Sequence, residues 1–155
     1  MAEQLKPRSE VSEDLKWDLT GIFATEEDFK AALEIFPHEV DAFVEQYKDK
    51  LKDAEIVVEA LHTYEKIIAE AGYLQQYAML PVNADITDGQ AASKMRSVAT
   101  IISKESAKLS FFDSEVLTLP ESEIAQVAKI EPAFKAWVRK TNKNKKAALA
   151  PEVEE

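Results

Sequence analysis

The sequence of 155 residues contains no cysteine, three glycines and two histidines. Without cysteine the chain can form neither disulfides nor thiolate sites, which favours a reducing compartment. The glycines, Gly21, Gly72 and Gly89, lie too far apart to build a glycine-rich phosphate loop. Scarce glycine and scattered β-branched residues also favour helices over a sheet.

Long apolar runs are also missing. No run reaches the ~18 residues that a membrane-spanning helix needs, and the charged stretch from Met1 to Glu13 lacks the apolar core of a secretory signal. We therefore expect no membrane partner and a cytoplasmic location. The formal charge of −10 at pH 7 argues against a nucleic-acid partner, because attraction to phosphate needs a basic face.

The composition, with 46% hydrophobic and 31% charged residues, is ordinary for a single globular domain. We predict a flexible lead-in over residues 1–14, a helical domain over 15–146, and the truncated start of a next element over 147–155. Three long stretches repeat apolar residues at steps of three and four, which is the spacing of amphipathic helices. The predicted fold class is all-α, an antiparallel bundle of about three long helices followed by two short helices.

The stretch from Asp53 to Val82 is the centre of this prediction. Asp53 is its expected N-cap, and Pro81 marks its expected end. At ~1.5 Å per residue, a helix over 54–80 spans roughly 40 Å and needs partners on several faces. Its main apolar stripe consists of Val57, Leu61, Tyr64, Ile68, Ala71, Ala78 and Val82.

Helices with a similar pattern flank the central one. Thr25 is the expected N-cap of a helix over 26–51, with acidic residues in its first turn. Pro37 lies in the middle, but the apolar phase continues across it, so we predict one bent helix, with two helices as the alternative. A third helix is expected over 88–111, with Asp88 as its N-cap.

Prolines also divide the C-terminal part. Pro120 suits the first turn of a short helix, and Glu131-Pro132 ends that helix and begins another with Trp137 inward. Ahead of the first long helix, four large apolar side chains among turn-forming residues are expected to dock onto the helices: Trp17, Leu19, Ile22 and Phe23.

The sequence offers no complete catalytic or metal site. Neither His38 nor His62 lies in an H-E-x-x-H helix turn, which puts two imidazoles on one face. Glu59 and His62 match the Glu-x-x-His element of di-iron bundles, but such a site needs a second element and two further glutamates, so we interpret the match as chance. We expect no catalytic, cofactor-binding or metal-ligating residue in this chain.

Three other groups have a structural explanation beside a functional one. The acidic run 26–28 could hold a cation, but acids in a first helical turn explain it more simply. The basic run 139–146 could contact an anionic partner, but cations also suit a solvated helix C-terminus. Tyr64, Tyr73 and Tyr77 could line a peptide groove, although packing in the core or at its rim is the simpler explanation.

An ordered set of stretches carries a family resemblance: residues 17–23 (Trp-Asp-Leu-Thr-Gly-Ile-Phe), 73–80 (Tyr-Leu-Gln-Gln-Tyr-Ala-Met-Leu) followed by 85–88 (Asp-Ile-Thr-Asp), and 110–121 (Ser-Phe-Phe-Asp-Ser-Glu-Val-Leu-Thr-Leu-Pro-Glu). The set resembles the N-terminal region of oligoendopeptidase F, a zinc oligopeptidase of the thimet-type superfamily. The family's segments read Trp-Asp-Leu-x-x-Leu-Phe, Tyr-x-Ser-Tyr-Ala-x-Leu with Asp-Thr-x-Asp, and Ser-Phe-Phe-x-Pro-Glu-Leu-x-x-Leu-Pro. The resemblance spans about residues 10–155.

The resemblance implies a helical domain that walls and gates the substrate channel of an enzyme hydrolysing short peptides, with zinc activating a water. The family's H-E-x-x-H helix and further glutamate ligand lie beyond this chain, so zinc is expected only in the full-length parent. The implied partners are the catalytic domain of the same polypeptide and oligopeptide substrates. Pro37 and Pro81 depart from the family pattern. The alternative is a stand-alone helical protein–protein interaction module without enzymatic activity.

A helical domain without its catalytic domain exposes apolar residues, so we expect weak homo-oligomerisation of the chain through a helix face. Sedimentation velocity over a concentration series should show a sedimentation coefficient that rises with concentration. A single monomeric species at the highest concentration would contradict this expectation.

Overall fold

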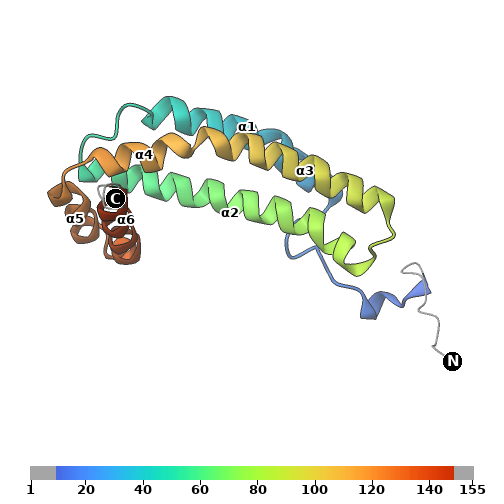
Figure 1. The fold of residues 1–155 in the computed structure, drawn as a ribbon. Helices are drawn as coiled ribbons and strands as arrows, with labels where there is room; N and C mark the ends of the chain where they lie inside the picture. The colour runs from blue at the N-terminus through green and yellow to red at the C-terminus, as the bar shows by residue number, and fades with distance from the viewer. Residues whose placement is uncertain (1–9, 149–155) are drawn as a thin grey trace, which may run out of the picture. The chain divides into compact units, whose positions relative to one another are not determined.

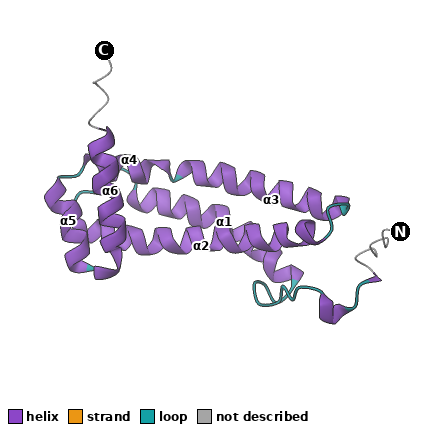
Figure 2. Ribbon diagram, turned by 60° about the horizontal axis from the view of Figure 1, so that its bottom comes forward, coloured by secondary structure: helices purple, strands orange, loops and turns teal. Residues whose placement is uncertain are grey.

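A computed structural model describes residues 10–148. Over this range the chain consists of helices and loops without a strand, so the predicted all-α class is confirmed (Figures 1 and 2). None of these helices is long and apolar enough to cross a membrane. The elements are η2 (Glu13–Leu15), α1 (Glu26–Tyr47), α2 (Ala54–Ala84), α3 (Gly89–Lys108), α4 (Ser110–Thr118), α5 (Glu121–Ile130), η3 (Pro132–Phe134) and α6 (Lys135–Ala148).

The chain divides into two compact units. The first unit contains Met1–Pro37 and Ala69–Lys104, and the second unit contains His38–Ile68 and Glu105–Glu155. Helices α1, α2 and α3 each contribute one segment to both units. The sequence-based limits of a single helical domain over 15–146 stay a prediction.

The core of the first unit forms where segments of α1, α2 and α3 pack side by side. Phe29 of α1 stacks on Tyr77 of α2, with ring centroids 4.8 Å apart. Phe23 meets both rings edge-on, at 5.6 Å and 5.4 Å, which is a favoured aromatic geometry. Other buried apolar side chains of this unit include Phe36, Ala71, Leu74, Ala78, Ala91 and Val98.

The second unit has an aromatic core of its own. Phe43 of α1 lies 5.9 Å from Tyr64 of α2 and 5.9 Å from Phe112 of α4. Tyr64 and Phe112 are themselves stacked, at 5.1 Å. Helices α5 and α6 pack against each other and against η3 in the same unit, and the buried side chains of these elements include Ile124, Val127, Phe134 and Val138.

Side chains from the C-terminal part of the second unit hold the turn between α1 and α2. Asp49 has a φ of 64°, a left-handed conformation that aspartate tolerates better than most residues. Its backbone N–H donates to the Glu115 carboxylate at 2.8 Å. Asp53 accepts the Ile56 N–H at 3.0 Å, which confirms its predicted role as the N-cap of α2.

The prediction of one helix across Pro37 is confirmed, since α1 continues through it. A proline removes only its own backbone donor, and the apolar residues on both sides keep one helical phase. The helix ends at Tyr47, however, and not at the predicted residue 51.

Two other predicted boundaries are wrong. Helix α2 runs past Pro81 to Ala84, because the proline removes only the bond from its own N–H to the Tyr77 carbonyl, and Asp85 still donates to the Pro81 carbonyl at 3.0 Å. The predicted helix over 88–111 is interrupted at Leu109. There, tight three-residue turns replace helical bonds, and Leu109 stays buried.

The boundaries of the C-terminal helices agree better with the prediction. Helix α5 begins directly after Pro120 and ends before Glu131, as predicted. Helix α4 was not predicted as a separate element, because residues 112–116 alone carry too short a pattern to mark a helix.

The predicted docking of the segment before α1 is confirmed for Phe23 and wrong for Trp17. The Phe23 ring contacts two helices, whereas Trp17 remains 58% exposed. On α2, Ile68 and Tyr73 are 43% and 54% exposed, so these two apolar positions lie outside the core.

We expect Leu74→Ala to destabilise the fold by about 2 to 5 kcal/mol, because it opens a cavity at a side chain with no exposed surface. The neighbouring substitution Tyr73→Ala is the matched control and should change stability by less than about 1 kcal/mol, since Tyr73 is half exposed. Urea denaturation followed by circular dichroism measures both, and equal losses would contradict the assigned burial.

Candidate functional site

The first unit contains a surface hollow between the segment before α1 and helix α2. We call it the Trp17 hollow. It has a volume of about 600 Å³ and combines aromatic rings with carboxylates. A second hollow of about 200 Å³ shares Trp17 and Leu19 with it and is completed by Leu80 and Pro81 of α2. The lining of the Trp17 hollow includes Glu13, Lys16, Trp17, Asp18, Phe23, Glu26 and Tyr77.

An ion pair anchors one side of the Trp17 hollow. The Glu26 carboxylate lies 2.7 Å from the Lys94 ammonium and accepts a hydrogen bond from the Tyr77 hydroxyl at 3.3 Å. The same ammonium lies 4.3 Å from the ring centre of Phe29 and 4.5 Å from that of Tyr77. Lys94 therefore combines an ion pair with two cation–π contacts.

The environment of Tyr77 shifts its ionisation. Burial raises the pKa of the Tyr77 phenol, and the charge of Glu26 and its hydrogen bond raise it further. Each cause favours the neutral phenol over the phenolate. Tyr77 is thus a hydrogen-bond donor to Glu26 at neutral pH.

Asp18 supplies a second carboxylate to the Trp17 hollow. One of its oxygens accepts the Thr20 hydroxyl at 2.6 Å and the Thr20 backbone N–H at 2.9 Å. These two bonds lower the pKa of Asp18, so the side chain is ionised at neutral pH. Glu13, by contrast, is paired with Lys16 at 2.5 Å.

The acidic run 26–28 divides between two structural roles. The Thr25 hydroxyl oxygen accepts the Asp28 backbone N–H at 3.1 Å and donates to its carboxylate at 2.8 Å, so the predicted N-cap is confirmed. Glu26 is used by Lys94 and Tyr77. Helix capping accounts for Asp28, and the ion pair with Lys94 accounts for Glu26.

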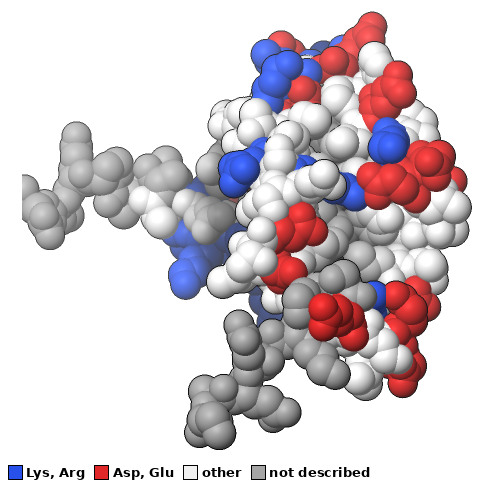
Figure 3. Space-filling view, turned by 90° about the vertical axis from the view of Figure 1, so that its right-hand side faces the viewer, with Lys and Arg blue, Asp and Glu red and all other residues white. Residues whose placement is uncertain are grey.

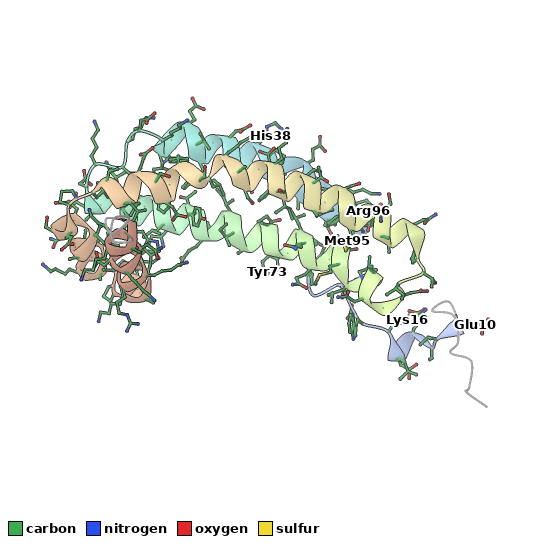
Figure 4. All side chains as sticks on the ribbon, viewed as in Figure 1. Glu10, Lys16, His38, Tyr73, Met95 and Arg96 are labelled. Atoms are coloured by element: carbon green, nitrogen blue, oxygen red, sulfur yellow. The ribbon has the colours of Figure 1, made fainter. Side chains whose placement is uncertain are left out.

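The three tyrosines of α2 do not share an environment. Tyr64 is stacked on Phe112 in the second unit, and Tyr77 is stacked on Phe29 in the first. For these two the packing interpretation is confirmed, and Tyr77 in addition lines the Trp17 hollow. Tyr73 is exposed on the side of α2 that faces away from α3 (Figure 4).

The histidines are not assembled into a metal site. The His62 Nε2 atom lies 4.0 Å from the Glu131 carboxylate, and its ring lies 5.0 Å from the Phe134 ring. Within residues 10–148, no three His, Cys, Asp or Glu side chains gather around a common point. Since a zinc site needs at least three such ligands, the described residues do not fit a zinc ion.

The basic run 139–146 lies on α6 in the second unit. Arg139, Lys140, Lys143 and Lys146 are exposed, while Lys145 donates to the Leu119 carbonyl. Cations in the last turn of a helix suit its dipole.

The Trp17 hollow could not be predicted from the sequence, for two reasons. Lys94 reaches Glu26 across 68 positions of the chain, and no local pattern announces that contact. Asp18 and Thr20 did offer a signal, because Asp-x-Thr forms a local turn bonded through the aspartate, but that turn alone does not indicate a hollow.

The raised pKa of Tyr77 predicts a pH dependence. The folded protein holds the phenolic proton more tightly than the unfolded chain, whose tyrosines have a pKa of about 10. This stabilisation is complete below about pH 10 and is lost as the pH rises through the folded pKa. Above about pH 10, the unfolding free energy should therefore fall less steeply in Tyr77→Phe than in the natural sequence. The exposed control Tyr73→Phe should keep the natural slope, and equal slopes for both variants would contradict the assignment.

Two curated proteins are similar to this chain. The "Oligoendopeptidase F homolog" of Borreliella burgdorferi is 26% identical over 143 residues, covering 92% of this chain and 22% of that protein. The "Oligopeptidase PepF" of Bacillus subtilis is 27% identical over 130 residues, covering 81% of this chain and 19% of that protein. No family model and no solved structure matches the chain.

This chain therefore spans about a fifth of the length of the curated relatives that it matches. The three sequence stretches that carry the family resemblance lie within the part of the chain that aligns with the Borreliella burgdorferi protein. The predicted resemblance is confirmed: over most of its own length this chain resembles oligoendopeptidase F.

Proposed function

We propose that the chain is the N-terminal helical region of an oligoendopeptidase F-like zinc metalloendopeptidase that hydrolyses short peptides in the cytoplasm. The observation that carries this proposal is the similarity, over most of the chain, to two proteins named for oligopeptide hydrolysis. The activity belongs to the whole polypeptide. We propose that the catalytic domain of that polypeptide packs against this chain.

The proposed role of the helices is to wall and gate the channel that admits oligopeptide substrates. A wall of this kind needs packed helices that present apolar side chains to the peptide. In the first unit, Phe36 and Leu74 supply a buried support. Trp17 and Tyr73 keep more than half of their surface exposed and are available to a peptide or to the catalytic domain.

Catalysis is not assigned to this chain. Zinc-activated water requires three protein ligands and an open coordination position, and residues 10–148 bring together no such set. The zinc ligands and the general base are proposed to lie in the remaining part of the polypeptide.

An activity assay tests this division of labour. We expect the purified chain not to hydrolyse a fluorogenic oligopeptide, with or without added zinc. The polypeptide that continues past Glu155 should hydrolyse it, and a chelator should abolish that activity. The Bacillus subtilis protein serves as a control for the substrate.

Two results would overturn the proposal. Hydrolysis by the chain alone that a chelator abolishes would place zinc ligands within it. A reading frame that reaches no H-E-x-x-H helix after Glu155 would favour the stand-alone helical interaction module.

A further inference from the structure

We infer that the Trp17 hollow binds a peptide segment in which a lysine or arginine lies next to an apolar side chain. The inference rests on the proposed function for its biological context, and it adds the chemistry of the peptide that this surface accepts. Its support comes from the shape, the exposed rings and the uneven charge of the Trp17 hollow.

The apolar part of the peptide would contact aromatic rings. Trp17 is 58% exposed, and the partly buried rings of Phe23 and Tyr77 lie 5.4 Å apart in the same hollow. A volume of about 600 Å³ is within the range of sites that hold small ligands or several side chains. Exposed tryptophan and tyrosine are also enriched where proteins bind partners.

The positive part of the peptide would pair with Asp18. Glu26 is neutralised by Lys94, and Glu13 by Lys16. Asp18 accepts bonds only from the uncharged Thr20 and has no lysine or arginine partner within the described residues. An ammonium or guanidinium group of a ligand could therefore form an ion pair with the Asp18 carboxylate.

The acidic residues around the hollow should disfavour acidic peptides. Asp85 and Asp88 line the adjoining second hollow, and Lys16 is the one cation among the lining residues of the two hollows. Figure 3 shows several groups of acidic side chains on the face that it views, together with lysines and arginines. Like charges repel, so these carboxylates should weaken the binding of a glutamate-rich peptide.

Tryptophan fluorescence provides a direct test. Trp17 and Trp137 are the two tryptophans, so Trp137→Phe leaves Trp17 as the single reporter. We expect an octapeptide of alternating lysine and leucine to shift the Trp17 emission to shorter wavelength, because the ring becomes covered. The same peptide with glutamate in place of lysine should leave the emission unchanged.

A pair of charge variants tests the role of Asp18. Asp18→Asn should weaken binding of the lysine peptide by about fivefold at low salt, the size expected of an exposed ion pair. Asp14→Asn removes the same charge four residues away, on an exposed side chain that does not line the hollow, and should leave the affinity unchanged. Raising the salt concentration should weaken binding to the natural chain more than to Asp18→Asn.

If Trp137→Phe loses its helical circular dichroism, anisotropy of the labelled peptides with the natural chain makes the same comparison. Equal binding of both peptides, equal effects of the two aspartate variants, or no binding would each overturn the inference. A shift of the Trp17 emission that grows with protein concentration in the absence of peptide would also overturn it. That result would identify the basic run 139–146 of a second copy as the occupant. Binding is measured without catalysis, so its outcome is separate from that of the activity assay.

Discussion

The pairing of aromatic rings between α1 and α2 is the constraint on which each unit depends. In the first unit Phe29 stacks on Tyr77, and in the second Phe43 packs against Tyr64. Rings of this size fit only when the two helices keep one register, because a sliding helix would bury a polar side chain instead. The same register brings Glu26 within reach of the Tyr77 hydroxyl. Packing of the core thereby also positions one wall of the Trp17 hollow.

The long helices could be predicted because their apolar residues repeat with a strong helical period over many turns. Boundaries were harder to predict where a local signal competes with packing. Pro81 looks like a terminator, yet α2 continues to Ala84. Leu109 carries no breaker residue, yet the chain turns there and keeps its side chain buried. At Pro81 the loss of one backbone donor does not end the helix, and at Leu109 the chain turns without a local signal that marks the turn.

The candidate site was less accessible to sequence reasoning than the fold. The density of large apolar side chains around Trp17 predicts that it docks onto the helices, and nothing in the local pattern indicates that its ring stays exposed. The bond between Glu26 and Lys94 joins distant parts of the chain and follows only from the packed helices. The family resemblance, by contrast, was readable from the order of three short stretches, since none of them depends on knowing tertiary contacts.

Lys94 has a consequence for how the Trp17 hollow selects its ligand. A lysine from within the fold already sits over the Phe29 and Tyr77 rings and beside Glu26, where an incoming cation would otherwise bind most strongly. The Lys94 ammonium therefore already occupies the place beside Glu26 and the two rings. The proposed ligand cation would pair with the exposed Asp18 instead, where water screens the charge and release is fast. If the hollow binds the proposed basic peptides, this exposed pairing would favour short contacts over long retention.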